Sequence, residues 1–375
     1  MKIVGIIIES NPFHNGHQYL IDQVKKQLNP DILIALSSGY FTMRGEISLL
    51  SKKTKTKLLL DAGFDLVIDF PLYLLLNSSD FFGKNGVDIL KRCNITHLAF
   101  GIEADNLDQL ISISNLMDSN NFKKTFVNNL KNQISYKKAI QNSLTSLSDL
   151  DSSTIDILMH SNNTLAFGYL HALKNYNITP FGIKRIGNLE ENNQLDEFPS
   201  GTALRESFLS KQDISKYLPY NQNCLSSFDN YDIKYKTIVE TLFINDPNKY
   251  SNCLHITEGI ENYIFKNYNS NLSINDNIQS LSNKKYTKSR IRRTILSMIL
   301  QIPSDLNYDQ NQIRVLGFNK KGENYLKEIS GNLILNISKC SNDLISIDLK
   351  ASKLYDLLTD NNTYIEEYQF PLKGE

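Results

Sequence analysis

The chain has 375 residues, of which 40 are basic and 40 acidic, so it carries no net charge at pH 7. This length suits two or three domains, and the balanced charge excludes binding to nucleic acid or membrane through an overall field. The four cysteines lie far apart without metal-type spacing, which favours a reduced, cytoplasmic protein without a metal site of its own. The apolar stretch at the N-terminus is too short for a signal peptide or a membrane span, so we predict no membrane association.

Strands and helices alternate over about the first hundred residues. Apolar, β-branched runs predict buried strands at residues 2–8, 31–39, 64–71 and 96–103. Helical spacing predicts helices between them, at residues 17–28, 53–63 and 81–93. This rhythm predicts an α/β fold with a Rossmann-like, doubly wound parallel sheet, whose ligands lie at the carboxyl ends of the strands. Four polar segments follow these strands and are predicted to wall one site: residues 9–17, 37–46, 69–82 and 100–106.

The rest of the chain changes character. Residues 107–175 have helical patterns, residues 180–187 predict one more strand, and residues 198–210 predict a loop that enters a helix. Beyond residue 211 helical patterns dominate, and the tail predicts a helix followed by an extended end. We therefore predict two domains: a sheet domain at residues 1–210 and a mainly α-helical domain at residues 211–375.

The first strand is followed by the segment ESNPFHNGHQYL, residues 9–20. A loop between a buried strand and a helix offers free backbone N–H groups and the positive end of the helix dipole, which attract phosphate. Gly16 permits close backbone approach, and His14 and His17 can donate hydrogen bonds to phosphate oxygens. On these residues alone, the histidines could equally be local hydrogen-bonding groups. Zinc is disfavoured because the sequence places no third ligand nearby.

Two motifs carry a resemblance. His14-Asn15-Gly16-His17 matches the HxGH signature of the nucleotidyltransferase superfamily, and the segment from Ser200 to Arg205 matches its second signature, SxTxxR. The blocks GIIIESNPFHNGHQYL, SSGYFTMRGE, DLVIDFP, FGIE, SNNTLAFGYLHAL and IKRIG resemble, in order, those of the bacterial tRNA(Met) cytidine acetate ligase family. The resemblance implies an ATP-dependent enzyme that converts acetate to acetyl-adenylate with release of diphosphate. The acetyl group then passes to N4 of the wobble cytidine of elongator tRNA(Met), giving N4-acetylcytidine.

The resemblance also implies roles for individual residues, with His14 and His17 catalytic. The implied ATP contacts in the first segment are the two histidines together with Ile7, Ile8, Glu9, Ser10, Asn11, Pro12, Phe13, Asn15, Gly16, Gln18, Tyr19 and Leu20. Further implied contacts are Gly101, Asn162, Arg185, Ser200, Thr202 and Arg205. ATP would enter as a substrate with Mg²⁺ held largely by phosphates and water. From local sequence alone, Gly101 could merely permit a turn, Asn162 could cap a helix, and Arg185 could form a surface ion pair.

Residues 284–293 carry six basic side chains with Tyr286 among them. Such a segment can neutralise RNA phosphates while the tyrosine stacks on a base, although a basic helix face often only meets water. With the resemblance, residues 211–375 are predicted to bind tRNA, and the candidate contacts are Arg44, Lys285, Arg290 and Arg293. The lysine run at residues 52–57 predicts either a solvated helix face or a further tRNA contact.

Four residues depart from the family pattern: Ser10, Tyr40, Ile102 and Ser161. None of them is a histidine or an arginine, so they affect the expected acyl specificity more than the expected reaction with ATP. Two rival functions stay open. One is an adenylyltransferase of cofactor biosynthesis, which would not need a basic helical C-terminal half. The other is a non-catalytic RNA-binding protein on the same scaffold, against which the intact His14, His17 and Arg205 argue. The predicted partners are elongator tRNA(Met) and acetate, with no stable protein partner.

Overall fold

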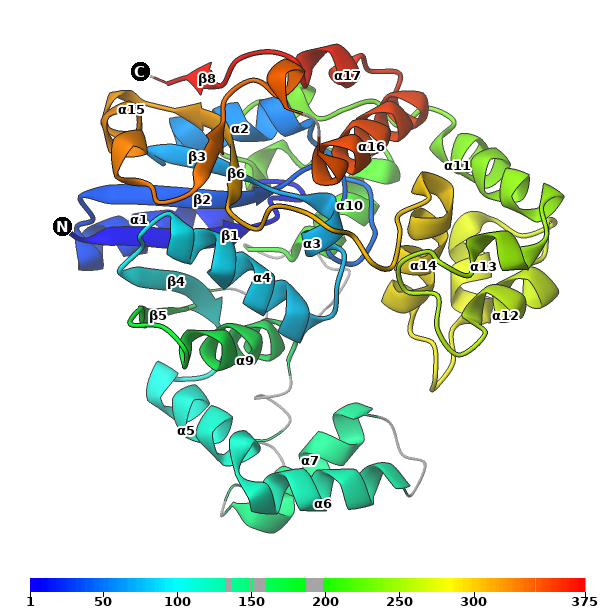
Figure 1. Ribbon diagram of the computed structural model, residues 1–375, viewed down its shortest axis with the longest axis horizontal. Coiled ribbons are helices and arrows are strands. Elements are labelled where there is room, and N and C mark those ends of the chain that lie inside the picture. Colours follow the sequence, from blue (N-terminus) through cyan, green and yellow to red (C-terminus); the bar gives the residue numbers. More distant parts are fainter. Residues whose placement is uncertain are drawn as a thin grey trace.

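The computed structural model describes residues 1–131, 136–148, 150, 155, 160–186, 198–340 and 342–374. Within these residues, one mixed sheet has helices on both faces, and two groups of helices stand away from it (Figure 1). None of the helices in the described part of the chain is long and apolar enough to span a membrane.

The sheet has the order β5-β4-β1-β2-β3-β6-β7, with β8 paired to β6. Its strands are β1 (Ile3–Ile8), β2 (Ile32–Ser38), β3 (Leu66–Phe70), β4 (His97–Ile102), β5 (Thr179–Lys184), β6 (Gln312–Phe318), β7 (Asn332–Ile334) and β8 (Leu372–Lys373). The first five strands pair in parallel, which confirms the predicted doubly wound sheet. Every residue of β2 and β3 is buried, as expected for parallel strands that are covered on both faces.

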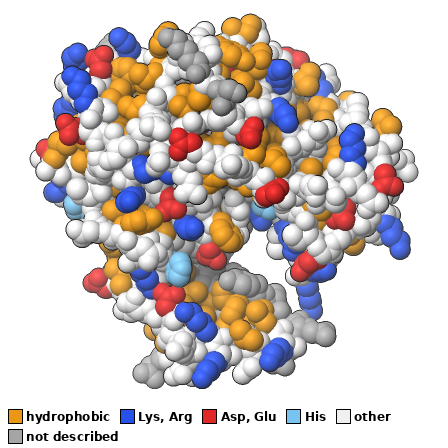
Figure 2. Space-filling view, in the orientation of Figure 1, with side chains coloured by type: hydrophobic (Ala, Val, Ile, Leu, Met, Phe, Trp, Pro, Cys, Tyr) orange, Lys and Arg blue, Asp and Glu red, His pale blue; other side chains and the backbone are white. Residues whose placement is uncertain are grey.

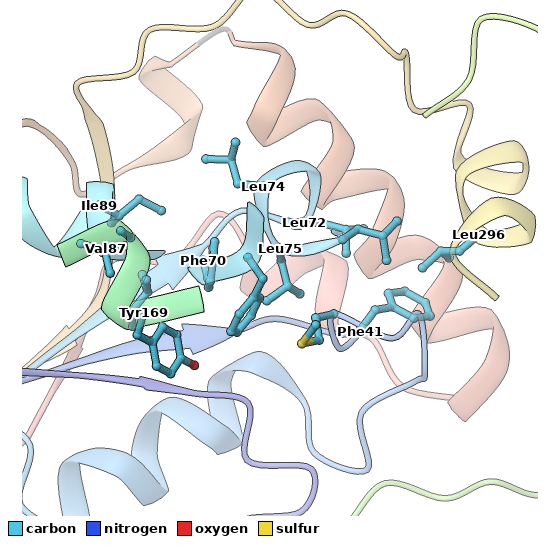
Figure 3. Packing of buried hydrophobic residues seen from close by; sticks show 14 of the residues in the cluster. Phe41, Phe70, Leu72, Leu74, Leu75, Val87, Ile89, Tyr169 and Leu296 are labelled. Carbon is cyan, nitrogen blue, oxygen red and sulfur yellow. The ribbon is translucent and has the colours of Figure 1, made fainter. Parts of the chain in front are cut away.

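Two sets of helices cover the two faces. One face carries α1 (Asn15–Leu28), α2 (Lys52–Asp61) and α10 (Gly201–Leu209), which share a core with Val4 and Ile6 of β1. The other carries α3 (Leu72–Leu75), α4 (Ser79–Arg92), α9 (Ser161–Leu173) and α16 (Asp343–Thr359). Figure 3 shows part of this second core, where Phe70 at the end of β3 lies beside Leu75 and near Val87 of α4. The α1 face and the α4–α9 face therefore meet only around the strand ends.

The remaining helices form two separate groups and the C-terminal additions (Figure 1). The groups are α5 (Leu107–Asp118), α6 (Asn120–Lys131) and α7 (Tyr136–Leu147), and then α11 (Tyr231–Glu240), α12 (Ile260–Asn267), α13 (Ile274–Leu281) and α14 (Lys288–Leu300). Short helices α15 (Lys320–Tyr325) and α17 (Thr363–Glu366) follow. Single 3₁₀ turns lie at Ser215–Tyr217, Gln222–Cys224, Thr241–Ile244, Pro247–Tyr250, Leu326–Glu328 and Ile337–Lys339. We call α11–α14 the helical domain.

The C-terminal part of the chain returns to the sheet, which the sequence analysis did not predict. Strand β6 pairs antiparallel with β3, opposing Phe318 to Leu66, and β7 and β8 pair with β6. The segment QIRVLGF alternates partly exposed and buried residues, a period of two that could have revealed the strand. The predicted tail is confirmed in outline, since α16 precedes the extended β8. A domain boundary at residue 210 stays a prediction.

A buried charge cluster ties this C-terminal part to α2, and we define it as Lys52, Asp69, Arg314 and Glu367. The Lys52 ammonium lies 2.9 Å from Asp69 and 3.3 Å from Glu367, and the Arg314 guanidinium lies 2.6 Å from Glu367. Lys55, which is 1% exposed, donates instead to the backbone carbonyls of Glu9, Ser38 and Gly39. The prediction of a solvated or tRNA-binding lysine face is therefore wrong for Lys52 and Lys55, because both amino groups are satisfied inside the protein.

Candidate active site

The corner between β1 and α1 is built by its two histidines. His14 is the N-cap of α1, and its Nδ1 accepts a hydrogen bond from the Gly16 N–H at 3.1 Å. The His17 Nδ1 in turn accepts one from the His14 N–H at 3.2 Å. These bonds satisfy helix N–H groups that would otherwise lack partners. Because both Nδ1 atoms are acceptors, the proton of each neutral ring must sit on Nε2, where it remains available to a ligand.

The surroundings hold both imidazoles neutral. Desolvation, followed by His17, Arg185 and Arg205, lowers the pKa of His14 well below its ordinary value. Desolvation, followed by Arg185 and Lys55, lowers the pKa of His17 to about 3. The two ring centroids lie 3.9 Å apart, so two charged rings would repel each other. The corner therefore presents two N–H donors amid positive charge, an arrangement suited to an anion.

Two adjoining cavities meet at this corner. The first, of about 200 Å³, is lined by Ile7, Ile8, Glu9, His14, Gly16, His17, Tyr19, Leu20, Phe82, Phe100, Gly101, Asn162, Leu165, Tyr169, Ile183, Lys184, Arg185, Ile186, Phe198 and Pro199. The second, of about 190 Å³, is lined by Glu9, Ser10, Asn11, His14, His17, Thr42, Met43, Arg44, Glu46, Glu103, Asn162, Leu165, Arg185, Ser200, Gly201, Thr202 and Arg205. Both histidines line both cavities, so they stand where the two spaces join. All four predicted wall segments contribute residues, so the cavities lie at the carboxyl ends of the strands, where ligands of such sheets bind.

Arg185 is held at this junction from two sides. Its guanidinium donates to the side-chain oxygen of Asn162 at 2.8 Å, and the Asn162 amide donates to the Glu103 carboxylate. A Cβ atom at Gly101 would lie 3.2 Å from the Arg185 Cγ, so this glycine makes room for the arginine. The alternative interpretations are wrong: Gly101 lies inside β4, the N-cap of α9 is His160, and Arg185 points into the site rather than to a surface partner.

The second signature forms the far wall of the second cavity. The Ser200 hydroxyl accepts the Ala203 N–H and caps α10. Arg205 donates to the backbone oxygen of Asn11 at 2.8 Å, to Thr202 at 3.0 Å and to Glu46 at 2.9 Å. Arg205 thereby joins α10 to the corner between β1 and α1. Together with Arg44 and Arg185 it gives the second cavity three guanidinium groups, a composition that suits phosphate.

Four residues of the predicted ATP segment line neither cavity. Phe13 and Pro12 are buried, Asn15 donates to the Lys216 carbonyl, and Gln18 donates to Asp22. A contiguous sequence block cannot separate them from the lining residues, because successive helix positions point in different directions. Several lining residues were not named individually in the sequence analysis: Thr42, Met43, Glu46, Phe82, Phe100 and Glu103 lie in the predicted wall segments, whereas Leu165, Tyr169 and Phe198 do not. The residues in the wall segments were indicated only by their position after a predicted strand.

The predicted RNA contacts do not form a single group. Tyr286 is 4% exposed and its hydroxyl donates to the Glu258 carbonyl, so the prediction that it stacks on a base is wrong. Arg290 donates to Thr257, Arg293 donates to the Asn77 carbonyl, and Lys285 is exposed. On the face in Figure 2, basic side chains are spread over the sheet and the helices with acidic ones between them. Arg44 lines the second cavity, and the adjacent Gly45 packs against the backbone of Arg292 and Arg293 in this segment.

The comparisons with known proteins agree with this geometry. A model of the HIGH nucleotidyl transferase family matches residues 1–369. The chain is 30% identical to the tRNA(Met) cytidine acetate ligase of Staphylococcus saprophyticus over 96% of both chains, and 32% identical to that of Clostridium perfringens over 98% of both. The chain belongs to the HIGH nucleotidyl transferase family and, within it, to the tRNA(Met) cytidine acetate ligases.

Solved structures share this fold. The crystal structure of Thermotoga maritima TmcAL aligns with a TM-score of 0.85 at 23% identity, over 100% of this chain and 99% of that one. A second structure of that protein, with bound alpha-thio ATP, aligns with a TM-score of 0.82 at 22% identity over the same shares. The predicted fold class and the family resemblance are both confirmed.

Proposed function

We propose that this chain is an ATP-dependent ligase that converts acetate to acetyl-adenylate and then acetylates N4 of the wobble cytidine of elongator tRNA(Met). The observation that carries the proposal is the His14–His17 pair, whose Nε2 atoms remain free to donate at the junction of two cavities. Family membership supports the same activity, since the curated relatives are tRNA(Met) cytidine acetate ligases.

The first step is a displacement at phosphorus. An acetate oxygen attacks the α-phosphorus of ATP, the bond to the β-phosphate oxygen breaks, and diphosphate leaves. His14 and His17 donate to the α-phosphate oxygens as charge builds on them, and Arg205 and Arg44 hold the departing diphosphate in the second cavity. Positioning of the substrates dominates such reactions. Arg185 is suited to position a phosphate, because Asn162 accepts its hydrogen bond and Glu103 in turn accepts one from Asn162.

In the second step the cytidine N4 attacks the acetyl carbon. The bond from that carbon to the phosphate oxygen breaks, AMP leaves, and N4 loses a proton. The magnesium that accompanies ATP would be held mainly by phosphate oxygens and water. Among the described residues, no group of three or more His, Cys, Asp or Glu side chains is placed to hold a metal ion. The helical domain would hold the tRNA, in the cytoplasm where tRNA resides.

The test measures exchange of labelled diphosphate into ATP with purified protein. We expect exchange that requires acetate, and mass spectrometry of elongator tRNA(Met) should then show N4-acetylcytidine. Exchange that requires a phosphorylated cofactor precursor instead would support a cofactor adenylyltransferase. Tight tRNA binding without exchange under any condition would support a non-catalytic RNA-binding protein. Either of these results would contradict the proposal.

A further inference from the structure

The first cavity has two ends that differ in kind. One end opens on the α1 face, where Tyr19, Leu20, Ile186 and Phe198 are partly exposed. The other end enters the α4–α9 face, and five side chains close it: Ile7, Phe82, Phe100, Leu165 and Tyr169. We call these five side chains the acyl box. The histidine pair lies on the wall that connects the two ends.

The acyl box is small because its rings pack on each other. Phe82, Phe100 and Tyr169 are 1%, 5% and 6% exposed, and the Tyr169 ring centroid lies 5.3 Å from that of Phe100 and 6.3 Å from that of Phe82. Such packing fixes the rings in place, so that widening the space between them for a second aromatic ring system would cost packing contacts.

Two glycines fix the spacing of the helices that carry these rings. A Cβ atom at Gly83 of α4 would lie 2.7 Å from the backbone of Gly168 in α9, and a Cβ at Gly168 would lie 2.7 Å from the Ser79 carbonyl. The helices therefore touch through their backbones, immediately beside Phe82 and Tyr169. The walls of the acyl box cannot come closer, and moving apart would sacrifice this contact.

The acyl box has a polar rim. The pKa of Tyr169 is raised by desolvation and then by the charge of Glu9, which lines the same cavity. Among the described residues, no hydrogen-bond partner is found for the Tyr169 hydroxyl, which points away from Val87 in Figure 3. Glu9 lines the same cavity as His14 and His17. The rim thus faces the reacting atoms, whereas the interior is apolar.

We propose that the acyl box receives the methyl group of the acid and restricts the substrate to a two-carbon carboxylate, while adenosine occupies the open end. The inference rests on the proposed function. The apolar walls cannot solvate a charge, so the carboxylate must stay at the rim, near the histidines and Arg185. Adenine requires more space than an opening between packed rings offers, and the partly exposed end on the α1 face is the more accessible of the two.

The first experiment compares unbranched acids in the diphosphate exchange reaction of the wild-type protein. Each added methylene should lower kcat/KM by about tenfold or more, because the closed rings cannot yield without loss of packing. The kcat/KM for acetate should therefore exceed that for propionate by at least about tenfold, and that for butyrate by a larger factor. Equal use of acetate and propionate would overturn the inference but would leave the ligase proposal intact. No exchange with any acid would count against the proposed function itself.

The second experiment compares one change at the two ends of the cavity. Phe100→Leu enlarges the acyl box. It should lower the ratio of kcat/KM for acetate to that for propionate by at least about threefold, with little change in KM for ATP. The matched control Phe198→Leu should raise KM for ATP and leave that ratio unchanged. A raised KM for ATP in Phe100→Leu, with an unchanged acid ratio, would place adenine in the box and refute the inference. Thermal melting shows whether each variant is folded, and Tyr169→Phe, which keeps the ring, should retain the wild-type ratio.

Discussion

Two polar clusters lie near the carboxyl ends of β1 and β3, which β2 separates in the sheet, and they behave in opposite ways. At the β1 corner, His14 and His17 use one ring nitrogen to hold the backbone and keep the other for a ligand. In the buried charge cluster, Lys52 and Arg314 form ion pairs with Asp69 and Glu367. The first cluster lines cavities of about 200 and 190 Å³, whereas the second lines cavities of about 50 and 10 Å³ and its charges pair with each other.

The pKa directions separate the two clusters as well. Desolvation and neighbouring cations lower the pKa of His17 to about 3, since no carboxylate pairs with it. Desolvation also lowers the pKa of Lys52, but Asp69 and Glu367 outweigh it and the net direction is upward. Neutral imidazoles with free N–H donors can bind an anion from outside, whereas the charges of the second cluster are satisfied by one another. The number of basic residues in a segment does not distinguish them.

The largest expected effect is on activity at the corner. His17→Ala removes one donor to the α-phosphate and should lower the rate of acetate-dependent exchange by about 100-fold or more, while thermal melting changes little. Gln18→Ala is the matched control, because the neighbouring Gln18 lines neither cavity and should keep wild-type exchange. A His17→Ala protein that melts early but exchanges normally would make the corner structural, and the comparison would fail.

The converse holds for the buried charge cluster. Glu367→Gln leaves Lys52 and Arg314 with too little negative charge and should lower the free energy of unfolding by about 3 kcal/mol, with KM for ATP unchanged. Denaturant titration gives the first quantity and exchange kinetics the second. The adjacent Glu366 is the control, since its ion pair with Lys53 lies at the surface and Glu366→Gln should cost less than about 1 kcal/mol. Equal losses of unfolding free energy in Glu367→Gln and Glu366→Gln would contradict a stabilising role for the buried charge cluster.

A pH dependence also separates the clusters. The folded-state pKa of His17, about 3, lies below its ordinary value of 6.5, so the unfolded chain binds the proton first as the pH falls. His17 should therefore reduce stability between pH 6.5 and about 3, by at most about 1.4 kcal/mol per pH unit, and His17→Gln should remove that slope. The pKa of Glu367 is lowered from 4.5, desolvation being outweighed by Lys52 and Arg314, so its contribution is lost only below pH 4.5. Denaturant titrations of both variants across pH 3 to 8 test these windows.

The corner could be predicted from the sequence because its geometry is local. A buried strand, a turn and a helix N-terminus follow within residues 3–17, and the histidine spacing fixes both capping bonds. The first five strands were equally readable, since each is a short and mainly apolar run. The positions of Gly101, Asn162 and Arg185 rested on the family resemblance, and the contacts among them join residues far apart in sequence.

Contacts between distant segments explain what sequence reasoning missed. Lys52 and Lys55 have the pattern of a solvated helix face, and only Glu367, Asp69 and the strand-end carbonyls show that they are interior. Tyr286 lies in a basic segment but packs within the helical domain. The acyl box draws its residues from β1, α4, β4 and α9, which no local pattern assembles. Such features become visible only when the chain is folded.

The most direct test is a crystal structure of this protein with a non-hydrolysable ATP analogue. The account predicts α-phosphate oxygens within about 3 Å of the Nε2 atoms of His14 and His17, the outer phosphates beside Arg205, and adenine on the α1 face. A nucleotide bound elsewhere, or phosphates that do not contact either imidazole, would contradict the central claim that this corner holds ATP for attack by a carboxylate.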